Sequence, residues 1–508
     1  MKSRFRALWL LLGTAILLIL AVGCNDTLRQ FIVPVPGTSG NPGPLAHAII
    51  LSTNALAAPP NNSIPGSDTH IDVSGDTNAG IVTLGLNPVF LGETTSRAFI
   101  INQGDANTPP TVSTYTALLP QSSIVNTITL PSTSSGPVAG TTDSAGNIFI
   151  ANSGSNTVDV ISAGVLAVTA TVPVGLHPVM IAGNSTNNKI FVVNQGDNTV
   201  TEISTIDDTV IKTIPVGLQP VWAVMSSDGL FVFVVNQGDG TVSVIDASLD
   251  IILPCDTTTP SCINSGTAIK VGATATPSPN FAFYDPTLRR IYINNTGENS
   301  ISIIKGNAFD LGSNPQVLPA KIADIPLSGP PVSLTALANG TRAYAALGNC
   351  PAGTNHLTIL ANIPSCTGNQ VSVIDVVGLR EIGTITVGAG AISVDSSPDS
   401  SRVFAISAND TTTIRDNVHL PNCTGTNCLP PPPLPDRTFN TPSIYVIPTS
   451  TNVPLVTPVD PSIVSRPLPT FFVPQQDPAC VPAVDPNFNN KVAQPCPAQT
   501  PIVVRAFP

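Results

Sequence analysis

The sequence predicts an all-β fold: a single β-propeller of about seven to eight four-stranded blades, closed into a ring by strands from the N- and C-terminal regions. Short apolar strands recur at intervals of 42 to 59 residues, the range in which four-stranded blades fall. The composition combines 51 Pro and 38 Gly with only 10% charged residues, which is typical of a turn-rich β-protein. Beyond the first two dozen residues, few apolar runs have the 3.6-residue period of helices.

The N-terminal segment is typical of an export signal. Lys2, Arg4 and Arg6 precede an uncharged apolar run from Ala7 to Val22. A membrane-spanning helix needs about 20 apolar residues, so this run is short for a span, and an uncleaved anchor is the alternative interpretation. We therefore expect residues 1–23 to be a signal peptide.

The end of this segment, Leu20-Ala21-Val22-Gly23-Cys24, resembles the lipobox of bacterial lipoproteins, although Ala21 stands where Leu is usual. The resemblance implies that Cys24 becomes lipidated and N-terminal, so that the protein is held on a membrane of the bacterial cell envelope, periplasmic or cell-surface. Residues 24–46 are rich in Pro and Gly and are predicted to be a flexible tether. The inner or outer membrane stays open.

The repeat is clearest in five strands that end in Asn. Three of them are followed by a turn and a second strand, as in Gln195-Gly-Asp-Asn-Thr-Val200, which predicts a hairpin. The five strands are Phe99-Ile-Ile-Asn102, Phe149-Ile-Ala-Asn152, Phe191-Val-Val-Asn194, Phe233-Val-Val-Asn236 and Tyr292-Ile-Asn-Asn295.

A second shared piece lies upstream, where Gly and Pro at fixed offsets predict a turn that joins strands. Its best copies are Leu84-Gly-Leu-Asn-Pro-Val89, Val174-Gly-Leu-His-Pro-Val179 and Val216-Gly-Leu-Gln-Pro-Val221, and strands such as Val244-Ile-Asp246 close the hairpins. Together these pieces resemble the YVTN-family β-propeller repeat. The resemblance covers residues 47–475, is clearest between 84 and 305, and implies the propeller fold.

Anchor strands near residues 51, 100, 150, 192, 234, 292, 345 and 405 indicate eight units, whereas seven is commoner in the family. The first unit lacks an opening strand, and we expect the segment Pro467 to Pro474 to supply it from the far end. Such closure removes unpaired sheet edges. An open solenoid is the alternative architecture. Residues 476–508 are predicted to be a Pro-rich tail pinned by a disulfide.

The cysteines other than Cys24 form four sequence-local pairs in long insertions. In an oxidising compartment local disulfides are the simplest arrangement, and no pair has the Cys-x-x-Cys spacing of a zinc site. The candidate pairs are Cys255 with Cys262, Cys350 with Cys366, Cys423 with Cys428, and Cys480 with Cys496.

No catalytic constellation emerges from the sequence. The repeated Asn102, Asn152, Asn194, Asn236 and Asn295 are interpreted as structural anchors that bond their own turns rather than as a ring of ligands. Asp105, Asp197 and Asp239 recur beside Gly, but the alternating loop of a calcium site is absent. His177 is interpreted as a polar turn residue, and no metal or cofactor is expected.

The net charge of −11 opposes binding to a phosphate backbone, so nucleic acid is not an expected partner. We expect an envelope-anchored lipoprotein whose propeller is a binding or scaffold module for a protein or glycan partner. The alternative is a propeller enzyme, such as a lactonase or an oxidoreductase subunit, for which acidic, Arg and His residues should converge in the central channel.

Overall fold

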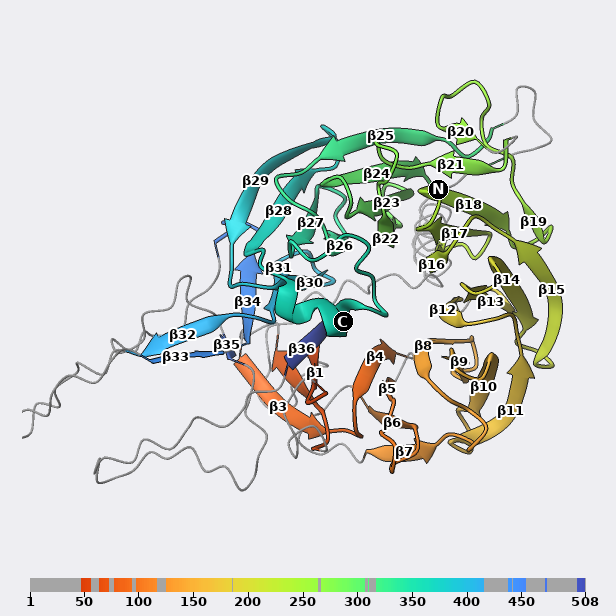
Figure 1. Cartoon of the computed structure of the whole chain (residues 1–508), viewed down its shortest axis with the longest axis horizontal. Coiled ribbons are helices and arrows are strands. Elements are labelled where there is room, and N and C mark those ends of the chain that lie inside the picture. Colours follow the sequence, from red (N-terminus) through yellow and green to blue (C-terminus); the bar gives the residue numbers. More distant parts are fainter. Residues whose placement is uncertain are drawn as a thin grey trace, which may run out of the picture.

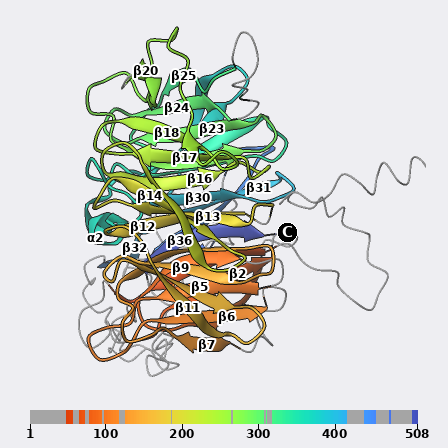
Figure 2. The same ribbon diagram turned by 90° about the vertical axis from the view of Figure 1, so that its right-hand side faces the viewer.

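The computed structural model describes residues 47–55, 64–72, 77–93, 97–116, 125–184, 186–263, 266–306, 309, 317–414, 437–440, 442–453, 471–472 and 500–507. These residues form eight blades around one axis, each an antiparallel sheet of at least four strands (Figure 1). The predicted propeller is confirmed, and the ring excludes the solenoid. Figure 2 shows the same disc from its edge.

In each blade the strands follow one another from the channel outwards. The inner strands, in ring order, are β36 (Thr500–Phe507), β4 (Pro88–Glu93), β8 (Pro137–Thr142), β12 (Pro178–Ala182), β16 (Pro220–Met225), β22 (Pro279–Asp285), β26 (Ser333–Ala336) and β30 (Ala391–Ser396). The second strands are β1 (His47–Thr53), β5 (Arg97–Asn102), β9 (Ile148–Asn152), β13 (Lys189–Asn194), β17 (Phe231–Asn236), β23 (Arg290–Asn295), β27 (Arg342–Leu347) and β31 (Arg402–Ser407).

The third strands are β2 (Ser67–Asp72), β6 (Thr111–Thr116), β10 (Thr157–Ser162), β14 (Thr199–Ser204), β18 (Thr241–Asp246), β24 (Ser300–Lys305), β28 (Gln370–Asp375) and β34 (Ser443–Pro448). The outer strands are β3 (Thr77–Thr83), β7 (Asn126–Thr129), β11 (Ala167–Pro173), β15 (Thr209–Pro215), β21 (Ala268–Lys270), β25 (Lys321–Pro326), β29 (Arg380–Thr386) and β35 (Phe471–Phe472). Blade 5 also carries β19 (Ile251–Ile252) and β20 (Cys262–Ile263).

The second strands carry most of the core. All eight predicted anchors are second strands, and their aromatic residues lie among the largest fully buried side chains. The sequence of a strand that is covered on both faces by neighbouring blades is a continuous apolar run rather than an alternation of apolar and polar residues. The buried aromatic residues at this position are Phe99, Phe149, Phe191, Phe233, Tyr292, Tyr344 and Phe404.

The ring closes through β36, which pairs antiparallel with β1 and supplies the inner strand of blade 1. Closure by the two ends of the chain is confirmed, but the predicted closing segment, Pro467 to Pro474, was wrong. Its described part, β35, pairs instead with β34 at the outer edge of blade 8.

The last eight residues before Pro508 therefore belong to the propeller, not to the predicted tail 476–508. The physical reason lies in the residues. Pro501 is followed by an apolar triplet in which Ile502 and Val504 are buried, whereas the two Phe residues of β35 stand in a segment rich in Pro, which cannot donate to a central ladder and suits an edge.

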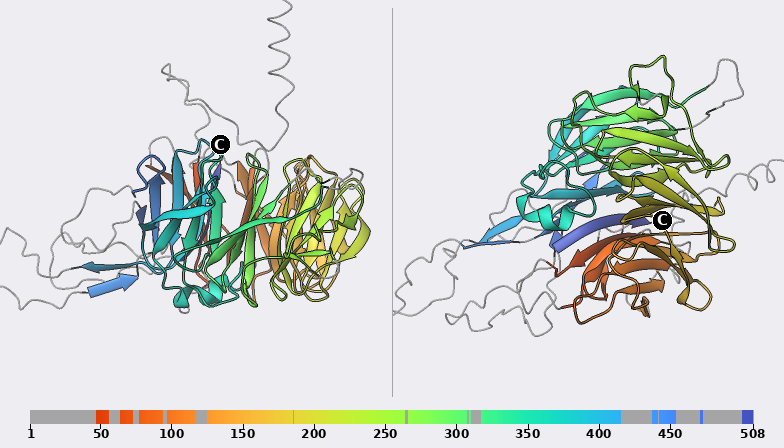
Figure 3. Two further views of the ribbon diagram at one scale, coloured as in Figure 1. Left: turned by 90° about the horizontal axis from the view of Figure 1, so that it is seen from above. Right: turned by 45° about the vertical axis from the view of Figure 1, so that its right-hand side comes forward.

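Two insertions interrupt the later blades. Residues 348–369, between β27 and β28, include α2 (Ile359–Asn362) and η3 (Ile363–Ser365) and are called the cap below. Blade 8 is extended by a two-stranded sheet of β32 (Thr411–Ile414) and β33 (Arg437–Asn440), which projects from the disc in Figures 1 and 3. Across the described ranges, no helix has the length and apolarity to cross a membrane.

Two of the four predicted cysteine pairs are disulfides, Cys255–Cys262 in blade 5 and Cys350–Cys366 in the cap. Cys24, Cys423, Cys428, Cys480 and Cys496, like segments 1–46 and 473–499, lie outside the described residues.

Candidate functional site

The five repeated Asn residues lie at the ends of second strands, and all five are buried. Each side-chain amide donates to side chains of the third strand of the same blade, for example from Asn194 Nδ2 to Thr199 Oγ1 at 3.0 Å and to Thr201 Oγ1 at 2.9 Å. Gly175 leaves the space for this amide, since a Cβ there would lie 2.5 Å from Asn194 Nδ2. Asn102, Asn152, Asn236 and Asn295 make equivalent bonds.

His177 lies in the turn between blades 3 and 4, with a positive φ of 52°. Its backbone N–H donates to Asn156 Oδ1 at 2.7 Å, and one repeat later Gln219 N donates to Asn198 Oδ1 at 2.8 Å. Asn and Gly adopt positive φ most readily, so His177 is held there by this inter-blade bond. Its imidazole is exposed on the turn.

Acidic side chains near these turns accept hydrogen bonds from backbone N–H groups. Asp197 Oδ2 accepts from Leu176 N at 3.0 Å, and Asp239 Oδ2 accepts from Leu218 N at 3.1 Å. Asp105 lies in its own loop, where bonds from the amides of Asn107 and Thr108 lower its carboxyl pKa.

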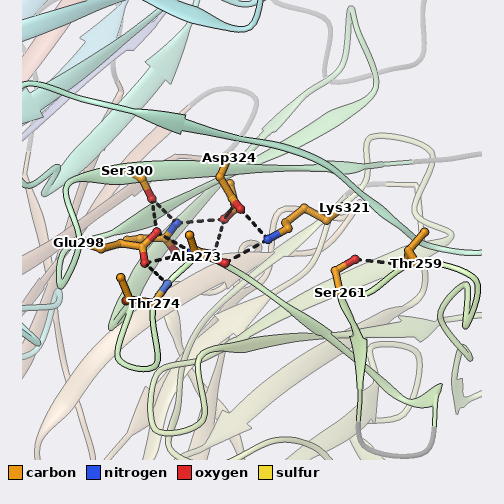
Figure 4. Close-up of polar contacts among 11 residues, drawn as sticks. Thr259, Ser261, Ala273, Thr274, Glu298, Ser300, Lys321 and Asp324 are labelled. Atoms are coloured by element: carbon orange, nitrogen blue, oxygen red, sulfur yellow. Dashed lines mark hydrogen bonds and ion pairs between the residues drawn. The ribbon is translucent and has the colours of Figure 1, made fainter.

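Blade 6 extends this pattern (Figure 4). Glu298 accepts from Ala273 N at 2.9 Å and from Thr274 N at 2.7 Å, while Lys321 forms an ion pair with Asp324 at 2.6 Å. Burial alone would raise the pKa of Glu298, but bonds from the Ser300 hydroxyl and from Thr274 outweigh it and lower that pKa. Within the described residues, no three His, Cys, Asp or Glu side chains are grouped to hold a metal ion.

A buried polar cluster joins blades 1 and 2. The Tyr115 hydroxyl donates to Asp68 Oδ2, and His70 Nε2 lies 3.2 Å from Tyr115 Oη and 3.3 Å from Asp68 Oδ1. All three residues are buried. Burial and the neighbouring Asp68 carboxylate raise the pKa of Tyr115 well above its ordinary value, so the phenol stays a donor. Because all three side chains are buried between the two blades, the cluster is an inter-blade contact.

Residues near the start of the inner strands line the capped end of the central channel. Most of these strands begin with Pro, and six inner strands have a β-bulge at their second residue. Bulges re-aim side chains and are frequent beside functional sites. The channel is lined from this position or the next by Phe90, Val138, Trp222 and Phe281, and also by Ser333 of β26 and Val503 of β36.

The cap covers one mouth of this channel, and in Figure 2 its helix α2 lies on the opposite side of the disc from the C-terminus. It is rooted in blade 7 and bonds to other blades. His356 Nε2 donates to Val179 O in blade 4 at 2.7 Å, and Asn355 Nδ2 donates to Gln237 Oε1 in blade 5 at 3.1 Å.

Blades 6 and 8 hold the cap as well. Asn280 Nδ2 donates to Thr354 O at 2.9 Å, and Asn409 Nδ2 donates to Cys366 O at 2.9 Å. The disulfide Cys350–Cys366 joins the two ends of the cap. The cap is therefore fastened at its base and along its length.

Between the cap and the inner strands lies a cavity of about 180 Å³. Its described lining contains no Asp, Glu, Lys or Arg, and His356 is its titratable side chain. Burial lowers the pKa of His356 to about 4, so the imidazole is neutral at pH 7. Its ring lies edge-on to Trp222, with 5.0 Å between the ring centroids.

None of the sequence-predicted site residues lines this cavity. The five Asn, the acidic residues and His177 support the turns around it. Sequence reasoning missed Trp222, Asn280, Phe281 and His356. Two signals pointed to them: the Pro-apolar pair that opens successive inner strands, and the length of the insertion that follows Leu347, where the repeated Asn is missing.

No protein-family model matches the chain, and no curated protein matches it. Among solved structures, the dihydro-heme d1 dehydrogenase NirN is similar with a TM-score of 0.54 and 10% identity, over 86% of this chain and 78% of NirN.

Two lactonase structures are more distant. A putative 6-phosphogluconolactonase of Bacteroides fragilis has a TM-score of 0.48 and 14% identity, over 70% of this chain and 97% of its own. The periplasmic gluconolactonase of Pseudomonas aeruginosa has a TM-score of 0.46 and 14% identity, over 68% and 97%. At such identities the likeness shows the fold alone, and the chain is an eight-bladed β-propeller with a cap over a cavity whose described lining carries no Asp, Glu, Lys or Arg.

Proposed function

We propose that the protein is a lipid-anchored binding module of the bacterial cell envelope, built on YVTN-type repeats, that presents the capped face of its propeller to a protein or glycan partner. The observation that carries the binding role is the lining of the cavity beneath the cap. General acid-base catalysis needs a group whose pKa lies near the working pH and a partner within reach. The described lining offers His356 alone, with a pKa of about 4 and Nε2 bonded to Val179 O.

This lining also opposes the enzyme alternative, which requires converging acidic, Arg and His side chains. A lactonase test is direct: the body, residues 47–508, is mixed with gluconolactone and with 6-phosphogluconolactone, and acid release is followed by pH-stat. We expect the rate of the uncatalysed reaction. Hydrolysis above that rate which is lost in His356→Gln would contradict the proposal.

The anchor rests on the sequence. Lys2, Arg4, Arg6, the apolar run and the lipobox-like segment ending at Cys24 support export and lipidation. The two disulfides agree with an oxidising compartment, where such bonds persist.

The anchor is tested in a bacterial host that produces the full chain with labelled palmitate. We expect label in the wild-type protein and in the neighbouring control Asn25→Ser, and its loss in Cys24→Ala together with release from the membrane fraction. Label that persists in Cys24→Ala would overturn the anchor.

The partner face is tested by capture of envelope components on the body, residues 47–508. Leu218, in the turn before β16, is 55% exposed on the capped side, whereas Ile206, in the turn after β14, is 78% exposed on the other side. We expect Leu218→Glu to lower specific capture and Ile206→Glu to leave it unchanged. Equal capture by both variants, or an empty capture with wild type, would contradict the assignment of this face.

A further inference from the structure

The cavity beneath the cap is walled by aromatic rings from three different blades. Phe90, Trp222 and Phe281 come from β4, β16 and β22, and the rings of Trp222 and Phe281 lie 4.7 Å apart between centroids. Aliphatic side chains complete the wall, among them Val138, Val503 and, from the cap, Leu357. Apolar walls with a few placed polar groups are typical of small-molecule sites.

The wall excludes charged ligands on physical grounds. Transferring an ion out of water without a partner is far more costly than transferring a neutral group. The described lining carries no Asp, Glu, Lys or Arg that would compensate such a charge. An uncharged ligand with a largely apolar body fits this surface.

The polar atoms of the wall define what a ligand should offer. Three donors of the wall are occupied: Trp222 Nε1 donates to Ala282 O at 3.0 Å, Asn280 Nδ2 to Thr354 O at 2.9 Å, and His356 Nε2 to Val179 O at 2.7 Å. Two acceptors, Asn280 Oδ1 and His356 Nδ1, are buried without a partner among the described residues.

Both acceptors are fixed by the bonds of their own side chains. Asn280 cannot turn its amide around, because its nitrogen already faces the carbonyls of Thr354 and Val332. His356 carries its proton on Nε2, which leaves Nδ1 as an acceptor. An unpaired buried acceptor costs about 1–3 kcal/mol, and a ligand hydroxyl or N–H would remove that cost.

We propose that the capped channel binds a small uncharged molecule with an aromatic or aliphatic body and one hydroxyl or N–H donor. The proposal deepens the binding role proposed above and rests on it, by adding a small-molecule site to the partner face. The cap supplies one wall of the site, so occupancy of the channel and position of the cap are linked.

Trp222 makes the test direct. The chain has two Trp, Trp9 and Trp222, so the body, residues 47–508, contains Trp222 alone, at the cavity wall. This body holds every strand of the ring. Its fluorescence is titrated with three quenchers of one shape: 4-nitrobenzyl alcohol, which is neutral with a donor, 4-nitrotoluene, which is neutral without one, and 4-nitrobenzoate, which is anionic.

We expect saturable quenching by 4-nitrobenzyl alcohol, with an affinity at least tenfold above that of 4-nitrobenzoate. A cavity without a free acceptor would prefer the more hydrophobic 4-nitrotoluene by roughly tenfold, so we expect the alcohol to bind at least as tightly as 4-nitrotoluene. Quenching that rises linearly and equally for all three compounds would overturn the site. An affinity order with 4-nitrobenzoate first would overturn the uncharged class, and one with 4-nitrotoluene first would overturn the donor.

Two variants place the ligand in the cavity. Val503→Phe fills the wall from β36 and should abolish saturable quenching, while Val165→Phe, in the exposed turn after β10, should not. Leu357→Lys on the cap adds a cation and should raise the affinity for 4-nitrobenzoate at least fivefold, whereas Leu249→Lys in the turn after β18 should not. If Val503→Phe does not fold, the Leu357→Lys variant tests the site by itself. An unchanged affinity of that variant for 4-nitrobenzoate would contradict the site.

The result is independent of the anchor experiment. Absence of saturable quenching would contradict the small-molecule site only. The results of palmitate labelling and of partner capture would stand unchanged. Loss of the anchor or of the partner leaves the titration of the body unchanged.

Discussion

On the capped side, the second strands of blades 4 and 5 end in an Asn and a short turn, whereas the second strand of blade 7 runs into the cap. In blades 4 and 5 an Asn at the end of the strand, Asn194 or Asn236, bonds two hydroxyls of the third strand, and the turn between the strands is short. In blade 7 the equivalent residue is the buried Leu347, and the turn is replaced by the cap, residues 348–369.

The regular blades therefore contribute to stability, whereas the cap of blade 7 contributes to the candidate site. Where the repeat is regular, its polar side chains bond one another and the next turn, and the repeated Asn residues do not line the cavity. Where the repeat breaks, the chain leaves the sheet, crosses the channel mouth and brings His356 against Trp222. In this propeller the inner strands of the repeat supply most of the cavity wall, and the departure from the repeat in blade 7 covers the cavity.

The largest effect is expected in the regular region. Phe233→Ala removes a fully buried ring and leaves a cavity, which should lower the free energy of unfolding by about 3–5 kcal/mol. The measurement is urea unfolding followed by far-ultraviolet circular dichroism. Ile206→Ala, at a side chain that is 78% exposed, is the control and should change little. A loss below about 1 kcal/mol for Phe233→Ala would contradict the core that we describe.

A pH effect is expected in the capped region. The pKa of His356 is lowered to about 4 by burial, while that of an exposed His is about 6.5. The open or unfolded chain binds the proton first, so the stabilisation is full above pH 6.5 and is lost as pH falls towards 4, by up to about 3 kcal/mol.

The Trp222 emission spectrum reports this change, because the two rings are in contact. We expect it to shift between pH 6.5 and 4 in the wild type, much less in His356→Gln, and as in the wild type in the turn control His177→Gln. An identical shift in wild type and His356→Gln would show that another group is responsible.

A smaller effect is expected for the bonds between regular blades. Asn198→Ala removes the acceptor of Gln219 N, a bond that contributes about 1 kcal/mol, and it places Ala at a positive φ of 58°, which adds to the loss. Thermal unfolding should detect the loss. Val377→Ala, at a side chain that is 70% exposed in the turn after β28, is the control and should change little. No change in Asn198→Ala would mean that solvent replaces the bond.

The smallest effect on the ring is expected from the cap disulfide. In the folded ring the ends of the cap are already held together, since Leu347 pairs with Gln370. Replacing Cys350 and Cys366 by Ser should therefore change the free energy of local cap opening, with the ring still folded, by less than about 1 kcal/mol, seen as a modest acceleration of hydrogen exchange at residues 353–360. Cooperative unfolding of the whole ring in this variant would show that cap and blades form one unit.

The strand pattern was predictable because each blade repeats it. The eight second strands were located from runs such as Phe233-Val-Val-Asn236, and ring closure followed from an opening strand missing before His47. The closing segment was not found, because Thr470-Phe-Phe-Val473 and Ile502-Val503-Val504 are both apolar, and local propensity alone does not separate an edge strand from an inner one.

By itself the sequence determined the propeller, the second strands, the turn role of His177 and two local disulfides, since each of these depends on residues close together in the chain or on a period repeated along it. Only the tertiary structure decided that Phe90, Trp222, Phe281 and His356 share one wall. Phe90 and His356, the first and last of these residues, lie more than 250 residues apart in the sequence. They meet because the ring brings every inner strand to one axis, and because the cap of blade 7 crosses the mouth of the channel on that axis.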